Sequence, residues 1–509
     1  MLAGVLLAAA PVPRIAADEA GGRVRVAARR LEIVLALDGA RPVTWRACRP
    51  SCLGADARSG TSMRFTGESD APQPRLVLHG PGGPIDLDHL RFTVDRAGDG
   101  PAPRVTLRAD LPVDGVRLEE SFVVSADGYD TTLTVRLVGP GAAALAATAR
   151  PALEVRPGRD LAPPPAAGFA AMLERVGRVT VAGGAVHALP DQPGAGVALR
   201  AGEWAGVRGR FWAMLARPDN AAAAVEARPG PGVALVAAPA PAATEWRYTI
   251  YAGPVERPPL GRVAPELERL LLSGLWWWLR ALALGLLALL HALTAWIGHP
   301  GVAIIALAVS VKVLLLPLAA VAERLQERVN ATQARLQPGL DTINAAHRGE
   351  ERTRRTLALY RELGIHPLYT LQSLAGFLIQ IPVFIAVFDM LAEDVDLYRA
   401  PFLWIPDLSR PDALAALPAC VPFFGCALNL LPFLMSGVSL ATLLRFRSPV
   451  LTPALVRRQR RNLAAMTGLF FLLFYTFPAG MVLYWTSTNA FQLLSQEMRR
   501  WRRQRGAAT

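Results

Sequence analysis

The chain divides near residue 265 into two halves of different composition, and this division limits the folds that it can adopt. Residues 20–260 read as ordinary soluble sequence, whereas long apolar runs alternate with Arg-rich gaps from about residue 265 onward. The 509 residues carry 54 basic and 41 acidic side chains. Because the basic residues lie in short gaps beside apolar runs, they indicate membrane topology signals, and we expect no DNA-binding surface.

All but one of the 54 basic residues are Arg, and this bias excludes several kinds of catalytic site. A P-loop needs a Lys after its Gly-rich turn. The single lysine, Lys312, lies instead in the apolar run AIIALAVSVKVLLLPLA. The chain also has no H-E-x-x-H, G-x-S-x-G or G-x-G-x-x-G motif. We therefore expect a protein that is not an enzyme and that uses no nucleotide, metal or other cofactor.

Residues 22–255 predict an extracytoplasmic antiparallel β-sandwich. Leu31, Ile33 and Leu35 recur at period two, and the pattern returns over 132–137, as expected for strands buried on one face. Many short strands with Gly and Pro between them favour two packed sheets. Turn signals follow several strands, at the Asp-Gly pairs 38–39, 114–115 and 127–128.

The four cysteines have simple interpretations. Cys48 and Cys52, in C-R-P-S-C, either form an extracytoplasmic disulfide or remain two unpaired thiols. Cys420 and Cys426 lie in an apolar run, where Cys is most simply an apolar filler. No spacing typical of a zinc site occurs.

Two further segments have two interpretations each. Residues 1–21 contain the apolar stretch Leu2–Ala10, which is too short to cross ~30 Å of hydrocarbon. It is either signal-like or part of a truncated first transmembrane helix. Residues 262–298 predict a helix with three tryptophans at 276–278. This helix either lies amphipathically at the membrane interface or spans the membrane, because 281–290 is wholly apolar.

Five apolar runs in 301–498 predict a bundle of five core membrane helices, so the fold class is α+β with two domains. The runs are 301–320, 368–392, 414–440, 463–478 and 480–496. The gaps 321–366 and 445–461 and the tail 499–509 are Arg-rich, whereas 393–412 has two Arg and five acids. The positive-inside rule then places the Arg-rich segments in the cytoplasm, and 393–412 and the β domain outside. If 271–296 also spans, the β domain moves to the cytoplasm.

Lys312 lies within an apolar helix, where a charge costs ~2.5–3.5 kcal/mol. It therefore needs water, a partner or a function, unless its long stem reaches the cytoplasmic interface. Each polar or amphipathic side chain on the other predicted helices, when considered alone, is most simply interpreted as a contact between helices. Together with Lys312 they predict a wet substrate groove lined by Lys312, Gln380, Asn429, Tyr484, Trp485 and Asn489.

The cytoplasmic segments have a similar pair of interpretations. Residues 321–363 have helical periodicity with a break at Arg348-Gly349, which predicts a helical hairpin. The hairpin is either a docking surface or a solvated charged element. The Arg-rich 457–461 and 499–505 segments either bind anionic lipid or ribosomal RNA, or act as topology determinants alone.

At these residues the chain resembles the YidC/Oxa/Alb family of membrane protein insertases. The resemblance covers most of 245–500 and rests on stretches in the same order: WRYTIYAGP, VKVLLLPLA, RLQPGLDTIN with LALYRELGIHPL, LIQIPVFIAVFDML, APFLWIPDLS and FPAGMVLYWTSTNAFQLLSQ. The resemblance implies a periplasmic β-sandwich, an interfacial helix and five helices around a hydrophilic groove that opens to the cytoplasm and lipid. An Arg charges this groove in the family, and Lys312 matches its position.

The resemblance implies a multi-pass insertase and chaperone of the bacterial inner membrane. It implies nascent membrane proteins and the phospholipid bilayer as partners, with the ribosome and the Sec translocon. The sequence departs from the family at Lys312, in HPLYTLQSLAGF, which replaces a Gly-Cys-Pro segment, and in a missing first transmembrane helix.

Two other functions compete with this interpretation. A polytopic transporter would use Lys312 as a substrate or proton site, but such proteins usually contain internal repeats, and the sequence has none. A sugar-active enzyme on a membrane anchor would need a His/Glu acid–base pair. The soluble half offers His79, His89 and His187 without a convergent partner.

Overall fold

The computed structural model describes residues 13–506 with short gaps. The gaps are 19, 54–59, 67–73, 81, 99–101, 114, 159, 162–167, 175, 191, 193–195, 221–223, 241–242, 367–374 and 446–452. The apolar stretch Leu2–Ala10, most of HPLYTLQSLAGF and the end of the basic tail lie outside the described residues.

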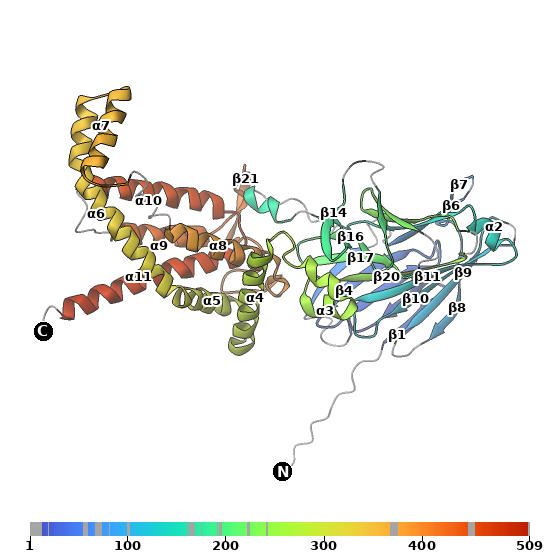
Figure 1. Cartoon of the computed structure of the whole chain (residues 1–509). Helices are drawn as coiled ribbons and strands as arrows, with labels where there is room; N and C mark the ends of the chain where they lie inside the picture. Colours follow the sequence, from blue (N-terminus) through green and yellow to red (C-terminus); the bar gives the residue numbers. More distant parts are fainter. Residues whose placement is uncertain are drawn as a thin grey trace, which may run out of the picture. The chain divides into compact units, whose positions relative to one another are not determined.

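The chain forms two compact units, one of strands and one of helices (Figure 1). The first unit comprises residues 1–165 and 171–273, and the second comprises 166–170 and 274–509. The predicted α+β fold, a β-sandwich followed by a helical bundle, is confirmed.

The β unit contains three antiparallel sheets. In spatial order, the nine-stranded sheet consists of β14 (Ala185–Ala188), β13 (Gly177–Ala182), β16 (Trp204–Arg208), β17 (Trp212–Pro218), β20 (Glu245–Pro254), β11 (Asp130–Val138), β10 (Arg117–Val124), β9 (Arg104–Asp110) and β8 (Thr93–Gly98). The six-stranded sheet consists of β15 (Val197–Leu199), β18 (Val225–Pro229), β19 (Val233–Ala237), β12 (Arg150–Val155), β6 (Arg75–Gly80) and β7 (Gly83–Ile85). The five-stranded sheet consists of β1 (Arg14–Asp18), β2 (Arg23–Ala27), β3 (Leu31–Ala36), β4 (Pro42–Arg49) and β5 (Thr61–Thr66).

The residues that the period-two pattern predicts to be buried are buried in these sheets. On β3, Leu31, Ile33 and Leu35 are buried, and on β11 Leu133 and Val135 are buried. Large aromatic residues fill the space between the sheets, since β16 and β17 of the large sheet contact β19 and β12 of the six-stranded sheet. The largest fully buried side chains include Trp45, Trp204, Trp212, Trp246 and Tyr248.

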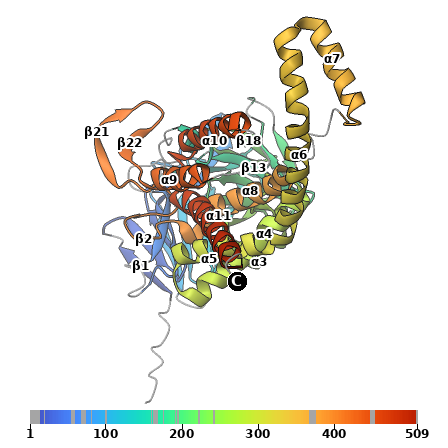
Figure 2. The same ribbon diagram turned by 90° about the vertical axis from the view of Figure 1, so that its left-hand side faces the viewer.

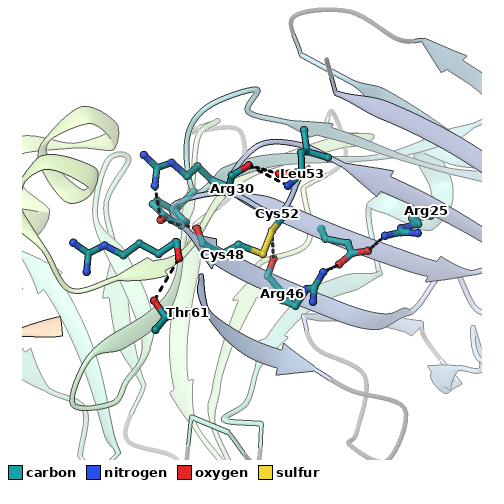
Figure 3. Close-up of a disulfide and its surroundings, with 11 residues drawn as sticks. Arg25, Arg30, Arg46, Cys48, Cys52, Leu53 and Thr61 are labelled. Carbon is teal, nitrogen blue, oxygen red and sulfur yellow. Dashed lines mark hydrogen bonds and ion pairs between the residues drawn. A yellow bond between two sulfur atoms is a disulfide. The ribbon is translucent and has the colours of Figure 1, made fainter. Parts of the chain in front are cut away.

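A disulfide joins Cys48, on β4, to Cys52 (Figure 3). The backbone around it is tied to neighbouring residues: the Cys52 amide donates to the Arg29 carbonyl oxygen, and the Tyr129 hydroxyl donates to the Cys48 carbonyl oxygen at 3.0 Å. Nearby, the half-exposed Arg25 and the less exposed Arg46 both pair with the buried Glu32. The disulfide interpretation of the first cysteine pair is therefore confirmed.

The second unit consists mainly of helices, with a long connection between the helices that end at Glu393 and begin at Leu431. Its elements are α4 (Trp277–Ile297), α5 (Pro300–Leu314), α6 (Leu316–Ala346), α7 (Gly349–Glu362), α8 (Ala375–Glu393), the 3₁₀ turn η4 (Val395–Leu397), α9 (Leu431–Leu444), α10 (Pro453–Phe474) and α11 (Ala479–Gly506). The α6–α7 pair forms the predicted hairpin, which projects from the rest of this unit (Figure 2). Four short elements lie earlier in the chain: α2 (Ala142–Ala146), η1 (Gly168–Met172), α3 (Arg257–Val263) and η2 (Pro265–Leu270).

Three boundaries differ from the sequence predictions. The predicted helix 262–298 is helical as one piece only over 277–297, because α3 and η2 occupy the residues before it. The Arg-rich 457–461 segment lies within α10, and the described part of the basic tail continues α11 to Gly506. These arginines therefore lie in helices, whereas a loop and a tail outside the helices were expected.

The predicted helix over 414–440 is wrong in its first half. Residues 415–428 form a hairpin of β21 (Ala415–Val421) and β22 (Gly425–Leu428), and α9 begins only at Leu431. A disulfide between Cys420 and Cys426 crosses this hairpin, so the interpretation of these cysteines as apolar fillers is also wrong. Phe423, in the turn, has a left-handed φ of 72°.

Among the described residues, one helix, α4, is long and apolar enough by itself to cross a membrane. The pair α5–α6 passes the same test as a broken span with a bend of 57°. This bend follows from Pro317 in the first turn of α6, because a proline starts a helix more readily than it continues one.

Candidate functional site

The five helices α5, α8, α9, α10 and α11 share one densely packed end. On α5 the buried residues run from Gly301 to Val311, and none of the next nine residues is buried. On α11 the first six residues are buried, and beyond them the described side chains are mostly half-exposed or exposed. Among the described side chains of α8 and α10, burial is confined to the residues near Glu393 and Phe474, and on α9 it is concentrated near Leu431.

The segment between α8 and β21 closes this packed end. Asp412, buried, accepts hydrogen bonds at Oδ2 from the Leu430 and Leu431 amides at 2.7 and 3.0 Å and so caps α9. The indole of Trp404 donates to the same oxygen at 3.1 Å. The Gly480 amide of α11 donates to the carbonyl oxygen of Leu408. These bonds seal one end of the bundle with backbone that is itself satisfied.

Of the predicted groove residues, Asn429 lies at this packed end and serves the fold. Its side chain is 2% exposed. Nδ2 donates to the Tyr475 carbonyl oxygen at 2.7 Å, and Oδ1 accepts from the Ala413 amide at 3.0 Å. An amide with these bonds has little remaining capacity for a passing substrate.

Tyr484 and Trp485 also lie in the packed half, five and six residues after the start of α11. Tyr484 is buried. The Trp485 ring lies 5.2 Å from the ring of Phe384 on α8 and 5.8 Å from that of Phe474 on α10, measured between centroids. Trp485 therefore joins three helices by aromatic packing.

Lys312 lies farther along, where burial on α5 ends. It is in the last turn of α5 and half-buried. Twelve residues after Pro300, it stands about 18 Å from the packed end at 1.5 Å per residue. Lys312 has no hydrogen bond or ion pair with any residue that the structure describes. The next two side chains, Val313 and Leu314, are exposed.

Gln380 and Asn489 lie at a similar depth on two other helices. Gln380 precedes the packed end of α8 by thirteen residues, and Asn489 follows that of α11 by ten, which gives about 20 and 15 Å. Both are half-buried. Asn489 donates to Ser439 Oγ of α9 at 3.0 Å. The predicted set thus separates by depth, with Lys312, Gln380 and Asn489 at one level and the other three nearer the packed end.

Two features of this unit were not predicted from the sequence. The first feature is the capping of α9 by Asp412. An acidic residue directly before a helix is a recognisable capping signal, but the β21–β22 hairpin separates Asp412 from α9 in the sequence. The second feature is a cluster of His291 with Asp394 and Asp396, two aspartates that follow it by more than one hundred residues.

The surface of this unit is unusually apolar. Of the described large hydrophobic residues that are exposed, all but Val138 and Met172 lie in the second unit. A patch of this extent on a soluble protein would mark an interface. Leu314, Leu378, Leu444, Leu469 and Leu494 carry it over all five helices.

Comparison with known families agrees with this architecture. Residues 292–504 match the family described as "60Kd inner membrane protein". This part of the chain is therefore similar to the YidC/Oxa/Alb family. The match starts at the end of α4 and covers every helix of the bundle with its hairpin.

Relatives in this family carry the name "Membrane protein insertase YidC". The protein of Pseudomonas aeruginosa strain LESB58 is 31% identical over 297 residues, which are 58% of this chain and 46% of the relative. That of Cupriavidus metallidurans is 33% identical over 250 residues, 48% of this chain and 40% of the relative. The matched region therefore spans about half the length of these relatives or less.

Solved structures were also compared. A crystal structure of an active YidC insertase with its first transmembrane domain resolved covers 96% of this chain and 95% of its own, with a TM-score of 0.37 and 15% identity. The YidC of Thermotoga maritima gives 0.32 and 13%, covering 95% of this chain and 99% of its own.

Proposed function

We propose that this protein is a membrane protein insertase that takes nascent membrane proteins into a hydrophilic, positively charged recess and releases their apolar helices into lipid. The observation that carries the proposal is the position of Lys312: a half-buried cation at the level where burial of the bundle ends. The similarity of residues 292–504 to this family and the names of the relatives support the same activity.

A lysine at this depth requires water. If α5 starts at the outer surface, about 18 Å of helix brings Lys312 past the middle of a hydrocarbon layer of ~30 Å. A dry, unpartnered ammonium there would cost ~2.5–3.5 kcal/mol or more. Among the described residues no carboxylate pairs with it. Water between the loosely packed halves of the helices would lower this cost.

The recess would be open toward the cytoplasm and closed toward the outside. The burial gradient supports this orientation. The densely packed end of the bundle, which Asp412 helps to close, is also the end at which the acidic segment predicted to lie outside is found. Lys312, Gln380 and Asn489 would offer one cation and two amides to acidic or polar parts of a guest. The guest's apolar helix would then enter lipid, driven by ~0.8 kcal/mol per buried CH₂.

The two disulfides support the proposed topology. Cys48–Cys52 lies in the β unit and Cys420–Cys426 in the 415–428 hairpin. Because disulfides persist in oxidising compartments, both segments belong on the extracytoplasmic side. The Arg-rich ends of α10 and α11 would then lie in the cytoplasm. This is a multi-pass inner-membrane protein with a periplasmic β domain.

We infer that α4 lies flat along the periplasmic face of the inner membrane. It runs across the direction of α8 and α11 (Figure 1). Its exposed tryptophans, Trp276, Trp277 and Trp296, are suited to headgroup depth. A flat α4 leaves the β unit outside, in agreement with its disulfide.

The α6–α7 hairpin is the proposed docking element for the ribosome or the Sec translocon. α7 carries mixed charge and has no buried residue, so most of its surface is open to a partner. The phospholipid bilayer would cover the exposed leucines of the bundle.

Reconstitution with Lys312 variants tests the proposal. Purified protein in vesicles is given a single-span guest with an acidic translocated tail, and protease protection of the tail measures insertion. We expect Lys312→Ala to slow insertion by roughly tenfold, equivalent to about 1.4 kcal/mol, and Lys312→Arg to retain most of the rate. The control is Arg324→Ala, which removes an exposed cation from α6. Normal insertion of acidic and neutral guests by Lys312→Ala would refute the role of this residue.

A further inference from the structure

We propose that His291, Asp394 and Asp396 form a binding site for one divalent transition-metal ion, best suited to Zn²⁺, which fastens α4 to the segment after α8. His291 lies in the second half of α4, Asp394 is the N-cap of η4, and Asp396 lies within η4. This site lies outside the proposed substrate recess and goes beyond the proposed function.

The three potential ligand atoms are already at coordination distances from one another. His291 Nε2 lies 3.2 Å from Asp394 Oδ1 and 3.4 Å from Asp396 Oδ2, and all three atoms fit within 4.8 Å. Around a tetrahedral metal with bonds of about 2.1 Å, ligand atoms are separated by about 3.4 Å. A metal ion can therefore be placed among these atoms with little movement of the backbone.

Asp394 gives independent support, because its charge is buried and incompletely satisfied. Its side chain is 3% exposed. Oδ1 accepts from the Asp396 amide at 3.1 Å, which fixes the carboxylate in place. Oδ2 is also buried and has no hydrogen-bond partner among the described residues. A buried carboxylate oxygen without a partner is costly, and a bound cation would remove this cost.

A protonated histidine alone satisfies this cluster less well than a metal ion. Nε2 carries at most one hydrogen, yet carboxylate oxygens of two different residues lie within 3.4 Å of it. A divalent ion would bond to the nitrogen and to both carboxylates and would balance two negative charges. An imidazole with two carboxylates favours Zn²⁺ over Ca²⁺ or Mg²⁺, which prefer oxygen ligands.

The site is accessible from one side. The His291 side chain is 36% exposed and that of Asp396 is 33% exposed, whereas Asp394 forms the buried floor. Water can complete a fourth coordination position on the exposed side. The bound ion would join parts of the chain 103 residues apart and so restrain α4 against the bundle.

Metal titration of the full-length protein in detergent tests the site. After treatment with a chelator, Zn²⁺ alone is added and bound metal is counted by elemental analysis. We expect one Zn²⁺ per chain and a rise in Tm of a few degrees. His291→Ala and, separately, Asp396→Asn should weaken binding at least tenfold and abolish the rise. His347→Ala, which removes a histidine at the α6–α7 turn, is the matched control and should behave as the wild type.

Three results would overturn the proposal. The first is wild-type protein that binds no Zn²⁺. The second is His291→Ala protein with unchanged stoichiometry and Tm shift, which would place the metal at another site. The third is binding of Ca²⁺ as tight as that of Zn²⁺ and insensitive to His291→Ala, which would indicate carboxylates alone. Because Asp396 is on the exposed side, Asp396→Asn tests the ligand set without altering the buried floor.

Discussion

The side-chain amide of Asn429 donates a hydrogen bond to the backbone carbonyl oxygen of Tyr475 at 2.7 Å. This bond connects a position two residues before α9 with the turn between α10 and α11. Because the amide is buried, Asn429→Ala leaves backbone groups of Ala413 and Tyr475 without partners. We expect a loss of about 2–4 kcal/mol in the free energy of unfolding, measured in detergent with chemical denaturant.

The matched control for this substitution is Asn489→Ala, also an asparagine of the bundle. Asn489 is half-buried and has a hydrogen bond to Ser439 Oγ at 3.0 Å. We expect a smaller loss of about 0.5–1.5 kcal/mol. Equal losses for the two variants would contradict the assignment of Asn429 to the packed end.

Glu120 predicts a pH dependence of the β unit. It lies on β10 between β9 and β11 and is 3% exposed, and burial raises its pKa from 4.5 to about 8. The folded state therefore holds this proton more tightly than the unfolded state. Its contribution is fully present below about pH 4.5 and is lost as the pH rises to about 8, at up to ~1.4 kcal/mol per pH unit.

Comparison with Glu120→Gln isolates this effect from other titrating groups. Thermal unfolding of the full-length wild type and of the variant is followed from pH 5 to pH 9. The Tm of the variant relative to the wild type should increase with pH, because Gln carries no charge to bury. A constant difference would show that Glu120 ionises normally in the folded protein.

Gly301 predicts a steric test of the packed end. A Cβ on this residue, in the first turn of α5, would lie 2.3 Å from ring carbons of Phe402. Gly301→Ala must therefore displace the closing segment, and we expect a loss of about 1–3 kcal/mol. A Cβ on Gly437, on α9, would enter open space. Gly437→Ala should therefore stabilise the helix by up to about 1 kcal/mol. Thermal unfolding of both variants checks the sign of each change.

The disulfides allow a direct test of topology. In intact spheroplasts, a membrane-impermeant maleimide should label neither cysteine pair before reduction and both after reduction. Each bridge closes a short loop, so replacing either pair by Ser should cost only about 2 kcal/mol. If Cys48 is labelled only after the membrane is permeabilised, the β unit lies in the cytoplasm and the proposed orientation is reversed.

The β unit could be predicted from the sequence because one-sided burial leaves a direct signal. Leu31, Ile33 and Leu35 alternate with other residues, and each is buried. The run 414–440 had no such signal, since an apolar stretch is compatible with either a strand pair or a helix. Its Pro418, Pro422 and Gly425 were the available indications of the hairpin.

The site was only partly predictable, because depth along a helix depends on where the helix starts and bends. The position of Lys312 near a helix end follows from Pro317, whose meaning is clear only once α6 is seen to turn away. Asn429 looked equivalent to Gln380 in sequence, but its hydrogen-bond partners come from distant segments. The His291 cluster depends wholly on tertiary contacts.

The gradient of burial along the five helices has a consequence for how the bundle moves. Helices held together at one end alone have their lowest-energy deformations at the other, where few contacts must break. Amide exchange should therefore quicken steadily from Gly301 toward Lys312. Under the proposed function, guest chains of different width would be admitted by changes in helix spacing at the loosely packed end, while the packed end stays closed.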